Sequence, residues 1–591
     1  MKKESLPVWD LTRFYASDSD PQIATDIVEL SKKYTALQKK YKGRIASLSA
    51  NEIEKLLDIL QKLNEKAGKV ASFAMLLATT DTIKPEYGIL QQKIVEWEAE
   101  ISKSMLFFGI EWKGLSEKKA QTILQQINNP VYAHYLSYKR QFAPYTLKED
   151  IEEVILEKDI TGSSSWSRLF TQLTSTLQYE YKGKSLTQSE ILSLVSNDKR
   201  HVRKQSAESV TKTLFGRKME LSHIFNTLVA DKMMEDKRRG YKNWLTSRNL
   251  ANKVSDDIVS SLVTSVTARY DIVSKHYRLK KKLLKLETLY EYDRYAPLVF
   301  TKPSEIPWSE GSQLVRNAYR QFSAEAGDVI DGFFEENYIH AALLPNKRGG
   351  AFCASTVSAA HPYILTNYMK RPDDVMTLAH ELGHGLHQYL AGKTQGDYGL
   401  HMPLVTQEMA STFGEMIVFH ELMNKLTNPK EKLTLLTQKI DSMIATVFRQ
   451  ISMHCFEDIV HTKRREGELT YEDISDAWIT TQRAMFGKSV TLTDNYKGWW
   501  SYIPHFIHTP GYVYAYAFGE LLALSLYKLY QKNPADFTPK YIELLKAGDS
   551  DYPVNLLKKV GVDISKKSFW EEGLQVIAEL VEEETKLSKQ I

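Results

Sequence analysis

Two histidines and a glutamate stand at a chemically meaningful spacing in the segment H-E-L-G-H at residues 380–384 of this 591-residue chain. Residues four apart lie on the same face of an α-helix. His380 and His384 can therefore direct two imidazoles at one metal ion, and Glu381 can reach a water bound to that ion. Zinc accepts imidazole and carboxylate ligands, and a catalytic zinc site keeps one position open for water. The spacing predicts a zinc hydrolase.

The alternative is a chance match on a solvated helix, which a motif with three fixed positions produces in roughly a few per cent of chains of this length. The flanking sequence favours the metal site. Pro372, Asp373 and Asp374 are typical of a helix start, with acidic residues at the positive end of the helix dipole. Buried histidine and glutamate side chains need partners, and a metal ion supplies them. Apolar residues predict that this helix is buried: Val375, Leu378, Ala379, Leu382 and Leu386.

The third protein ligand must come from outside this helix. A histidine six residues after His384 would mark one class of zinc protease, but Leu390 stands there. The next predicted helix offers two glutamates, Glu408 and Glu415. One of them would bind the metal, and the other would orient a ligand histidine through its second ring nitrogen. A surface carboxylate is the alternative for Glu415.

The predicted ligands imply a hydrolytic mechanism. Zinc lowers the pKa of its bound water towards about 7 and polarises the carbonyl of the substrate. Glu381 would accept the proton of the water and later deliver it to the leaving amine. The tetrahedral intermediate then needs hydrogen-bond donors directed at its oxyanion.

Residues 499–516 are rich in groups that could be those donors. Tyr512 and Tyr516 are four apart and would share one face of a helix. His505 and His508 add two imidazoles shortly before them. The alternative is aromatic packing in the core, which we expect for two further tyrosines of this stretch, Tyr502 and Tyr514.

Hydrophobic periodicity predicts a mainly α fold with a minor β component. Three short strands are expected at 177–181, 350–356 and 362–368, the first as a hairpin arm. A free strand edge beside the metal helix could pair with an extended peptide backbone. A loop is expected at 396–399. Apart from the metal helix, helices are expected at 23–41, 51–63, 69–79, 85–108, 403–424, 430–465, 471–486 and 512–532.

The composition is that of an ordinary soluble globular protein, with 43% hydrophobic residues, 25% charged residues and a net charge of +4. So small a charge predicts no nucleic-acid partner. The two cysteines, Cys353 and Cys455, argue against a disulfide framework and favour a reducing compartment. No apolar run of about 18 residues predicts a membrane span, and no signal peptide is evident after Met1. Together these observations predict a cytoplasmic protein without a membrane partner.

An ordered series of segments carries a resemblance to a known family. The segments read W-D-L-T-R-F-Y at 9–15, T-G-S-S-S-W-S-R-L-F at 161–170, Y-D-R-Y-A-P-L at 292–298, K-R-G-G-A-F-C at 347–353, L-A-H-E-L-G-H-G-L-H at 378–387, E-M-A-S-T-F-G-E at 408–415, I-P-H-F at 503–506 and Y-V-Y at 512–514. In this series the chain resembles oligoendopeptidase F, a member of the thimet-oligopeptidase-like zinc peptidases. Two features depart from the family pattern: Gly511 replaces an aromatic residue, and His508 is additional.

The resemblance implies a mostly helical, bowl- or clam-shaped molecule with one zinc ion deep in a channel, and cleavage of internal bonds of short peptides. It implies that His380, His384 and Glu408 bind the zinc and that Glu381 is the general base. The late histidines and tyrosines would contact the substrate. Either His505 or His508 could be the residue that faces the scissile carbonyl. We expect an N-terminal helical region at 1–200, packed without a linker against a catalytic region at 201–591.

Two rival hypotheses remain at this point. A zinc carboxypeptidase on a related helical fold would also carry H-E-x-x-H, but it would need a site for the free C-terminal carboxylate of its substrate. A non-catalytic, peptide-binding helical protein could retain the motif without using it. Because every residue type that hydrolysis needs is present, the preferred interpretation is a zinc endopeptidase acting on short peptides. The sequence leaves the oligomeric state open.

Overall fold

The computed structural model describes residues 5–300, 305–400 and 402–591. The chain divides into two compact units, and each is built from three separate stretches of sequence. Unit 1 consists of Met1–Thr146, Pro303–Leu422 and Leu529–Val562. Unit 2 consists of Leu147–Lys302, Met423–Lys528 and Asp563–Ile591. The expected division into regions 1–200 and 201–591 stays a prediction, and so does the expected bowl or clam shape. The expectation of no signal peptide falls partly on residues 1–4, which lie outside the described residues.

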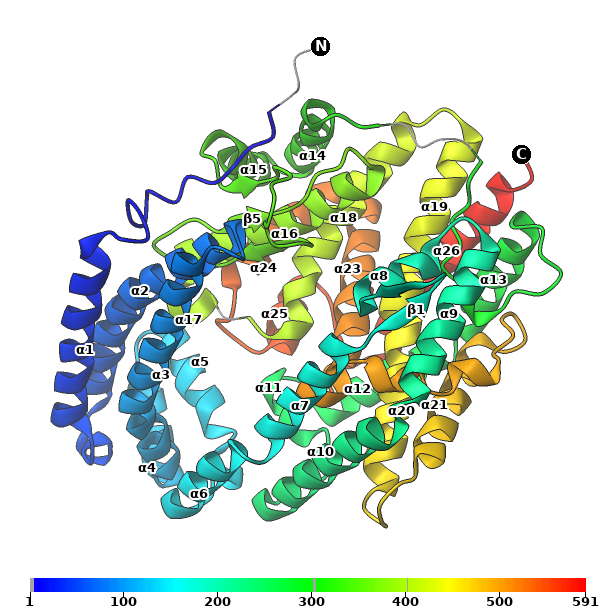
Figure 1. Cartoon of the computed structure of the whole chain (residues 1–591). Coiled ribbons are helices and arrows are strands. Elements are labelled where there is room, and N and C mark those ends of the chain that lie inside the picture. Colours follow the sequence, from blue (N-terminus) through cyan, green and yellow to red (C-terminus); the bar gives the residue numbers. More distant parts are fainter. Residues whose placement is uncertain (1–4, 301–304, 401) are drawn as a thin grey trace. The chain divides into compact units, whose positions relative to one another are not determined.

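Unit 1 begins with a helical bundle in which α1, α2 and α3 pack on one another (Figure 1). Apolar residues at three- and four-residue spacing form its core, including Leu30, Leu56 and Trp97. Further along the chain, α16 packs against α14, α15 and α24. The helices of unit 1 are α1 (Pro21–Tyr41), α2 (Ala50–Thr80), α3 (Pro85–Gly114), α4 (Glu117–Gln126), α5 (Pro130–Arg140), α14 (Trp308–Phe322), α15 (Ala324–Glu335), α16 (Pro372–Gln395), α17 (Asp397–Leu400), most of α18 (Leu404–Lys425), α24 (Pro534–Ala547) and α25 (Pro553–Lys559).

One long helix, α2, replaces the two helices expected at 51–63 and 69–79. No proline interrupts the intervening residues, and Gly68 lies inside the helix. A Cβ atom on Gly68 would lie 2.3 Å from a methyl group of Val357. The glycine therefore serves close packing rather than a helix end. A second difference is α17, a short helix where a loop was expected at 396–399.

A three-stranded sheet lies in unit 1 beside α16. Its order is β3 (Ile339–His340), β5 (Tyr363–Leu365) and β4 (Phe352–Ala354), with β4 antiparallel and β3 parallel to the central strand. The strands expected at 350–356 and 362–368 are confirmed as β4 and β5. The indole of Trp9 donates hydrogen bonds to the carbonyls of Tyr338 and Ile364, at 3.0 and 2.9 Å. The N-terminal W-D-L segment is thus part of this sheet region.

Unit 2 is also mainly helical, with an aromatic core that includes Phe225, Phe456, Trp478 and Trp500. Its two-stranded hairpin pairs β1 (Tyr179–Tyr181) with β2 (Lys184–Leu186), as expected from the sequence. The helices of unit 2 are α6 (Glu149–Asp159), α7 (Ser163–Thr176), α8 (Gln188–Ser193), α9 (Arg200–Phe215), α10 (Lys218–Arg239), α11 (Thr246–Ala251), α12 (Asp256–Thr267), α13 (Tyr270–Leu283), α19 (Pro429–Met443), α20 (Gln450–Lys463), α21 (Tyr471–Phe486), α22 (His505–His508), most of α23 (Tyr514–Lys532) and α26 (Lys567–Leu587).

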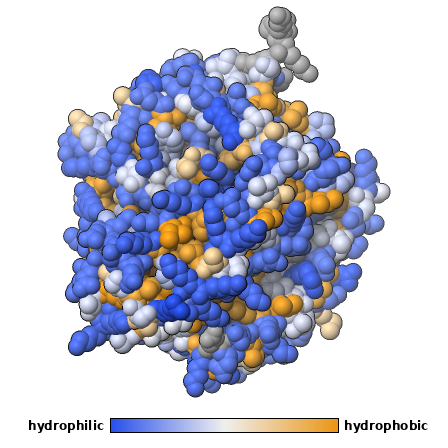
Figure 2. Space-filling model, turned by 90° about the vertical axis from the view of Figure 1, so that its left-hand side faces the viewer, coloured by the Kyte–Doolittle hydropathy of each residue, from blue (hydrophilic) through white to orange (hydrophobic). Residues whose placement is uncertain are grey.

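The predicted fold class, mainly α with small β elements, is confirmed. The helix expected at 430–465 is present as an unbroken helical run, in which a π-helical segment, Ile444–Arg449, joins α19 to α20. The face of the molecule drawn in Figure 2 is mostly hydrophilic, with hydrophobic residues in small separate patches. Within the described residues, no helix combines the length and the apolar character that crossing a membrane requires.

Candidate metal centre and active site

The helix that carries H-E-x-x-H begins where the sequence predicts. Asp374, which is 5% exposed, accepts backbone hydrogen bonds from Met369 at 2.7 Å and from Arg371 at 2.8 Å. Pro372 occupies the first turn of α16. A buried carboxylate that satisfies the N–H groups before the first turn holds the helix start in one position. The register of the two histidines is thereby set from the N-terminal end of the helix.

The helices α16 and α18 approach each other closely at two glycines. A Cβ atom on Gly383 would lie 2.4 Å from the carbonyl oxygen of Ala410. A Cβ atom on Gly414 would lie 3.2 Å from the carbonyl oxygen of Ala379. These contacts leave no room for a larger residue at Gly383 unless a backbone moves. The close approach brings Glu408 of α18 to the histidines of α16.

Gly383→Ala is expected to lower the free energy of unfolding by about 1–3 kcal/mol, the usual cost of overpacking. It should also weaken zinc binding, because a displaced α18 carries Glu408 with it. The control is Gly332→Ala in α15, where an added Cβ meets nothing within 4 Å. That substitution is expected to be neutral or to stabilise by roughly 0.5–1 kcal/mol. Urea unfolding and a competitive zinc titration measure both effects. Equal behaviour of the two variants would show that Gly383 is not needed for the close approach of α16 and α18.

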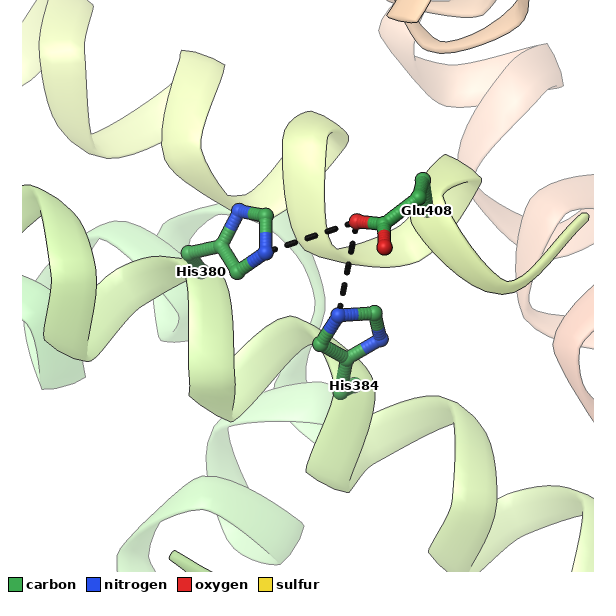
Figure 3. Close-up of side chains that lie close together, drawn as sticks. All are labelled: His380, His384 and Glu408. Carbon is green, nitrogen blue, oxygen red and sulfur yellow. Dashed lines mark ion pairs between the residues drawn. The ribbon is translucent and has the colours of Figure 1, made fainter. Parts of the chain in front are cut away.

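His380, His384 and Glu408 point towards one another (Figure 3). Oε2 of Glu408 lies 3.4 Å from Nε2 of His380 and 3.5 Å from Nε2 of His384, and all three ligand atoms lie within 4.8 Å of one another. Zinc bonds of about 2.0–2.2 Å at tetrahedral angles separate ligand atoms by roughly 3.3–3.6 Å. Ser411 donates to the same oxygen of Glu408 at 3.0 Å and orients it. The three side chains therefore fit a tetrahedral zinc ion.

The charges of the cluster also suit a cation. Burial lowers the pKa of His380, but its contacts with Glu408 and Glu415 outweigh burial and raise that pKa above its usual value. Burial raises the pKa of Glu408, but hydrogen bonds with His380 and His384 outweigh it and lower that pKa. The surroundings thus favour one positive charge between two carboxylates. A metal ion can supply that charge in place of a proton.

The two glutamates of α18 take different places around His380. Oε2 of Glu415 lies 3.4 Å from Nδ1 of His380, whereas Glu408 lies next to Nε2 of the same ring. Glu408 alone is close to both histidines. A carboxylate on the second ring nitrogen is the usual support of a metal-bound histidine. The geometry therefore favours Glu408 as the ligand and Glu415 as the residue that orients His380.

Glu415→Gln is expected to weaken zinc binding by about 10–100-fold while leaving the stoichiometry at one ion per chain. The amide can still accept a hydrogen bond from Nδ1, but it carries no charge. A competitive titration with a chelating dye measures the affinity. Glu421→Gln, on the same helix, is the matched control. Unchanged affinity in Glu415→Gln would show that Glu415 is only a neighbouring carboxylate.

Glu381 lies between the metal ligands and the edge of the small sheet. Its side chain is buried, and burial raises its pKa above the ordinary value, while a hydrogen bond from the backbone of Cys353 in β4 lowers it. Within the described part of the chain, β4 is paired only with β5. Its other edge is available to an extended chain. The carboxylate and this strand edge therefore belong to one site.

Three of the expected hydrogen-bond donors form a cluster within unit 2. The hydroxyl of Tyr516 lies 3.1 Å from Nε2 of His505. The ring of Tyr512 lies 5.7 Å from that of His505 and 5.1 Å from that of Tyr516. Burial and the nearby charges of Arg449 and His508 lower the pKa of His505, so its imidazole is neutral near pH 7. Two phenols and a neutral imidazole are thus presented together.

His508 has different neighbours. Its Nε2 lies 3.3 Å from the hydroxyl of Thr171, and its ring lies 5.9 Å from that of Phe170, both on α7. The structure therefore groups His505, but not His508, with the two tyrosines. Tyr514 is a core residue as expected, because it is fully buried and its hydroxyl donates to Asn249 at 2.7 Å.

The segment before Tyr512 is held by a residue that the sequence did not single out, Glu457. The backbone N–H of Gly511 donates to the carboxyl of Glu457 at 2.9 Å. Glu457 is 1% exposed, and burial raises its pKa to about 8. Gly511 has φ of +71°, and a Cβ atom there would lie 2.8 Å from a methyl carbon of Leu245. Glycine at this position permits both the turn and the close packing. The sequence signal that could have identified Glu457 is an acidic residue among the apolar residues of α20.

Comparisons with known proteins agree with this fold. The chain is 27% identical to oligopeptidase PepF of Bacillus subtilis over 92% of this chain and 82% of that protein. It is 27% identical to an oligoendopeptidase F homolog of Borreliella burgdorferi over 98% of both chains. The fold matches the crystal structure of oligoendopeptidase-F from Enterococcus faecium with a TM-score of 0.73 at 21% identity, over 97% of this chain and 99% of that one.

Two family models match successive parts of the chain. The model described as oligopeptidase F covers residues 111–179, and that of peptidase family M3 covers residues 193–576. The second match includes the H-E-x-x-H helix, both glutamates of α18 and the histidine and tyrosine cluster of unit 2. The resemblance inferred from the sequence motifs is confirmed: the chain is a peptidase that belongs to peptidase family M3.

Proposed function

We propose that this peptidase is a zinc-dependent endopeptidase that hydrolyses internal bonds of short peptides. The observation that carries the proposal is the cluster of His380, His384 and Glu408, whose ligand atoms lie within 4.8 Å of one another. These three residues would hold one zinc ion. When bound, zinc polarises the scissile carbonyl and lowers the pKa of water.

Glu381 is the general base of the proposed reaction. Its carboxylate follows His380 directly on α16 and is buried beside β4. It would accept a proton from the attacking water and pass that proton to the leaving amine. The unpaired edge of β4 would bind the peptide backbone as an added strand, which requires no particular side chains. Both groups come from elements that pack on each other, so water and peptide would meet at one place.

His505, Tyr512 and Tyr516 are the proposed hydrogen-bond donors to the oxyanion. Their clustering in unit 2 supports this role, and the neutral state of His505 suits a hydrogen-bond donor. Since His508 contacts α7 instead, we propose His505 as the imidazole that faces the scissile carbonyl. The catalytic role predicted for His508 stays untested.

Tyr512→Phe is expected to lower kcat by about 100–1,000-fold, the usual effect of removing one oxyanion donor. Tyr516→Phe should have a similar or smaller effect, because its hydroxyl also contacts His505. KM and the thermal unfolding temperature should change little, since only one oxygen is lost. Tyr181→Phe in the hairpin is the matched control. Wild-type kcat in both active-site variants would rule out the tyrosines as donors.

We propose that the enzyme acts in the cytoplasm on short peptides, without nucleic-acid or membrane partners. Both cysteines, Cys353 and Cys455, are free, which suits a reducing compartment. Fusion to a reporter that fluoresces only in the cytoplasm tests this location.

The test of the proposed function is a digest of peptides of graded length, acetylated at the N-terminus and amidated at the C-terminus, followed by mass spectrometry. An endopeptidase cleaves such peptides at internal bonds, with a rate that falls beyond a length limit. A carboxypeptidase requires a free C-terminus and would leave the blocked peptides intact. Binding without cleavage by the zinc-loaded protein would support the non-catalytic alternative and overturn the proposal.

A further inference from the structure

A cavity of about 800 Å³ lies within unit 2, next to the segment that carries the proposed donors. It is formed by α7, α10, α11 and the residues around α22. The side chains that matter for its chemistry are Arg168, Thr171, Lys232, Arg248 and His508. Pockets of several hundred Å³ are the usual size for a small ligand or for one to two residues of a peptide.

The cavity wall and the donor cluster share one short stretch of chain, residues 505–512. His508 lines the cavity and contacts Thr171 at 3.3 Å. Arg248 donates from Nε to the carbonyl of Pro510 at 3.2 Å. Pro510 directly precedes Gly511 and Tyr512. A group that occupies the cavity is therefore held close to the segment that carries the proposed oxyanion donors.

The charges in the cavity are only partly paired. Lys232 is bound by Asp236 at 2.9 Å, and Arg239 is bound by Glu152 at 2.8 Å and by Glu235 at 2.7 Å. Arg168 and Arg248 have no ion pair with any residue that the structure describes. Three carboxylates line the cavity, Asp231, Glu235 and Asp236, and of these Asp231 lacks a basic partner among the described residues. Among the lining groups that form no ion pair, two guanidinium groups stand against one carboxylate, so two basic side chains are available to a ligand.

We propose that this cavity binds a carboxylate of the peptide substrate, with Arg168 and Arg248 as its partners. The carboxylate would be either an aspartate or glutamate side chain or the C-terminus of a short peptide. A guanidinium presents paired N–H donors that match the two oxygens of a carboxylate. The inference rests on the proposed function, since it makes the cavity a specificity subsite of the same peptidase. It adds a substrate class, peptides that carry a carboxylate at a set distance from the cleaved bond.

The experiment compares kcat/KM for matched quenched peptides that differ in one carboxylate. One pair ends in a free carboxylate or an amide. A second series is amidated and carries glutamate or glutamine at successive positions on each side of the cleaved bond. The two arms distinguish a C-terminal carboxylate from a side-chain carboxylate. The wild-type enzyme is expected to prefer the charged member of at least one pair by roughly tenfold, the size of one charge-assisted hydrogen bond.

Arg168→Gln and Arg248→Lys should each reduce that preference to about threefold or less, because the first removes the charge and the second removes the planar fork. Arg278→Gln, an exposed arginine of α13 outside the cavity, should retain it. The proposal is overturned if the wild-type enzyme cleaves every pair at equal kcat/KM, or if the preference survives in both cavity variants.

Failure of the proposed function would look different. In that case no peptide would be cleaved. Fluorescence anisotropy with labelled acidic and amidated peptides would still measure how tightly each peptide binds to the protein. If Arg168→Gln bound the acidic peptide more weakly than Arg278→Gln, the result would support a carboxylate site in the cavity but not the proposed peptidase mechanism. Equal binding of the acidic and amidated peptides by the wild-type protein would reject it.

Discussion

Glu381→Gln is expected to lower kcat by about 100–10,000-fold, the range that general acid–base groups contribute. Glutamine has nearly the same shape as glutamate but cannot accept a proton from water at neutral pH. The side chain is buried in α16 beside the backbone of Cys353, so a change of shape would disturb packing, whereas the amide fits. The loss should appear in kcat, because the substrate is bound by other groups. Steady-state kinetics on a blocked peptide measure it.

Two measurements separate this effect from damage to the site. Zinc content should remain at one ion per chain in Glu381→Gln, since the residue is not one of the proposed ligands. The thermal unfolding temperature should stay within a few degrees of the parent value. If Glu381→Gln cleaved peptides at the parent rate, another group would have to move the proton, and the proposed mechanism would be wrong.

His384→Ala and Glu408→Gln are each expected to abolish stoichiometric zinc binding and to reduce activity by roughly 1,000-fold or more. The reason is that three protein ligands are the minimum seen at catalytic zinc sites, and the ion supplies several kcal/mol of transition-state stabilisation. In Glu408→Gln, the histidines also lose the carboxylate that lies 3.4 and 3.5 Å from them. Metal analysis after dialysis against a weak chelator gives the zinc content, and kinetics on the same samples give the activity.

His201→Ala is the matched control for the loss of a histidine, because His201 is exposed on α9, in the other unit of the chain. It should keep one zinc ion per chain and the parent activity. Added zinc should restore part of the activity of Glu415→Gln but little of that of Glu408→Gln. The reverse pattern would exchange the roles of the two glutamates.

Most of the helices followed from the sequence because their signals are local. The periodic spacing of apolar residues placed α1, α18 and α21 within a few residues of their observed bounds. The turn residues Lys182 and Gly183, both with positive φ, placed the hairpin. These features depend on neighbours in the chain, so a single sequence contains them.

Elements that depend on distant partners were not predictable in the same way. The strand β3 has two residues and exists because it pairs with β5, which lies more than 20 residues later in the chain. The close contact of Gly68 in α2 with Val357 joins residues that are far apart in the sequence. The buried position of Glu457 depends on the turn at Gly511, which comes from a different part of the chain.

The sequence by itself determined the chemistry of the candidate centre. The spacing of His380, Glu381 and His384 is a property of one helix, so the pair of imidazoles and the neighbouring carboxylate could be inferred without a fold. Local spacing alone left both Glu408 and Glu415 open, and only the resemblance to the family favoured Glu408. Only the tertiary structure places Glu408, rather than Glu415, next to both histidines.

The tertiary structure also distinguishes His505 from His508. Both lie on one short helix, and the sequence leaves both open as the residue that faces the scissile carbonyl, although only His505 belongs to the I-P-H-F segment. Their neighbours come from different elements, Tyr516 on α23 for His505 and Thr171 on α7 for His508. Residue types and local spacing are properties of the chain. The direction in which each side chain points is decided by the packing of helices that are distant in sequence. Here that packing includes the close crossing of α16 and α18 at Gly383 and the turn at Gly511.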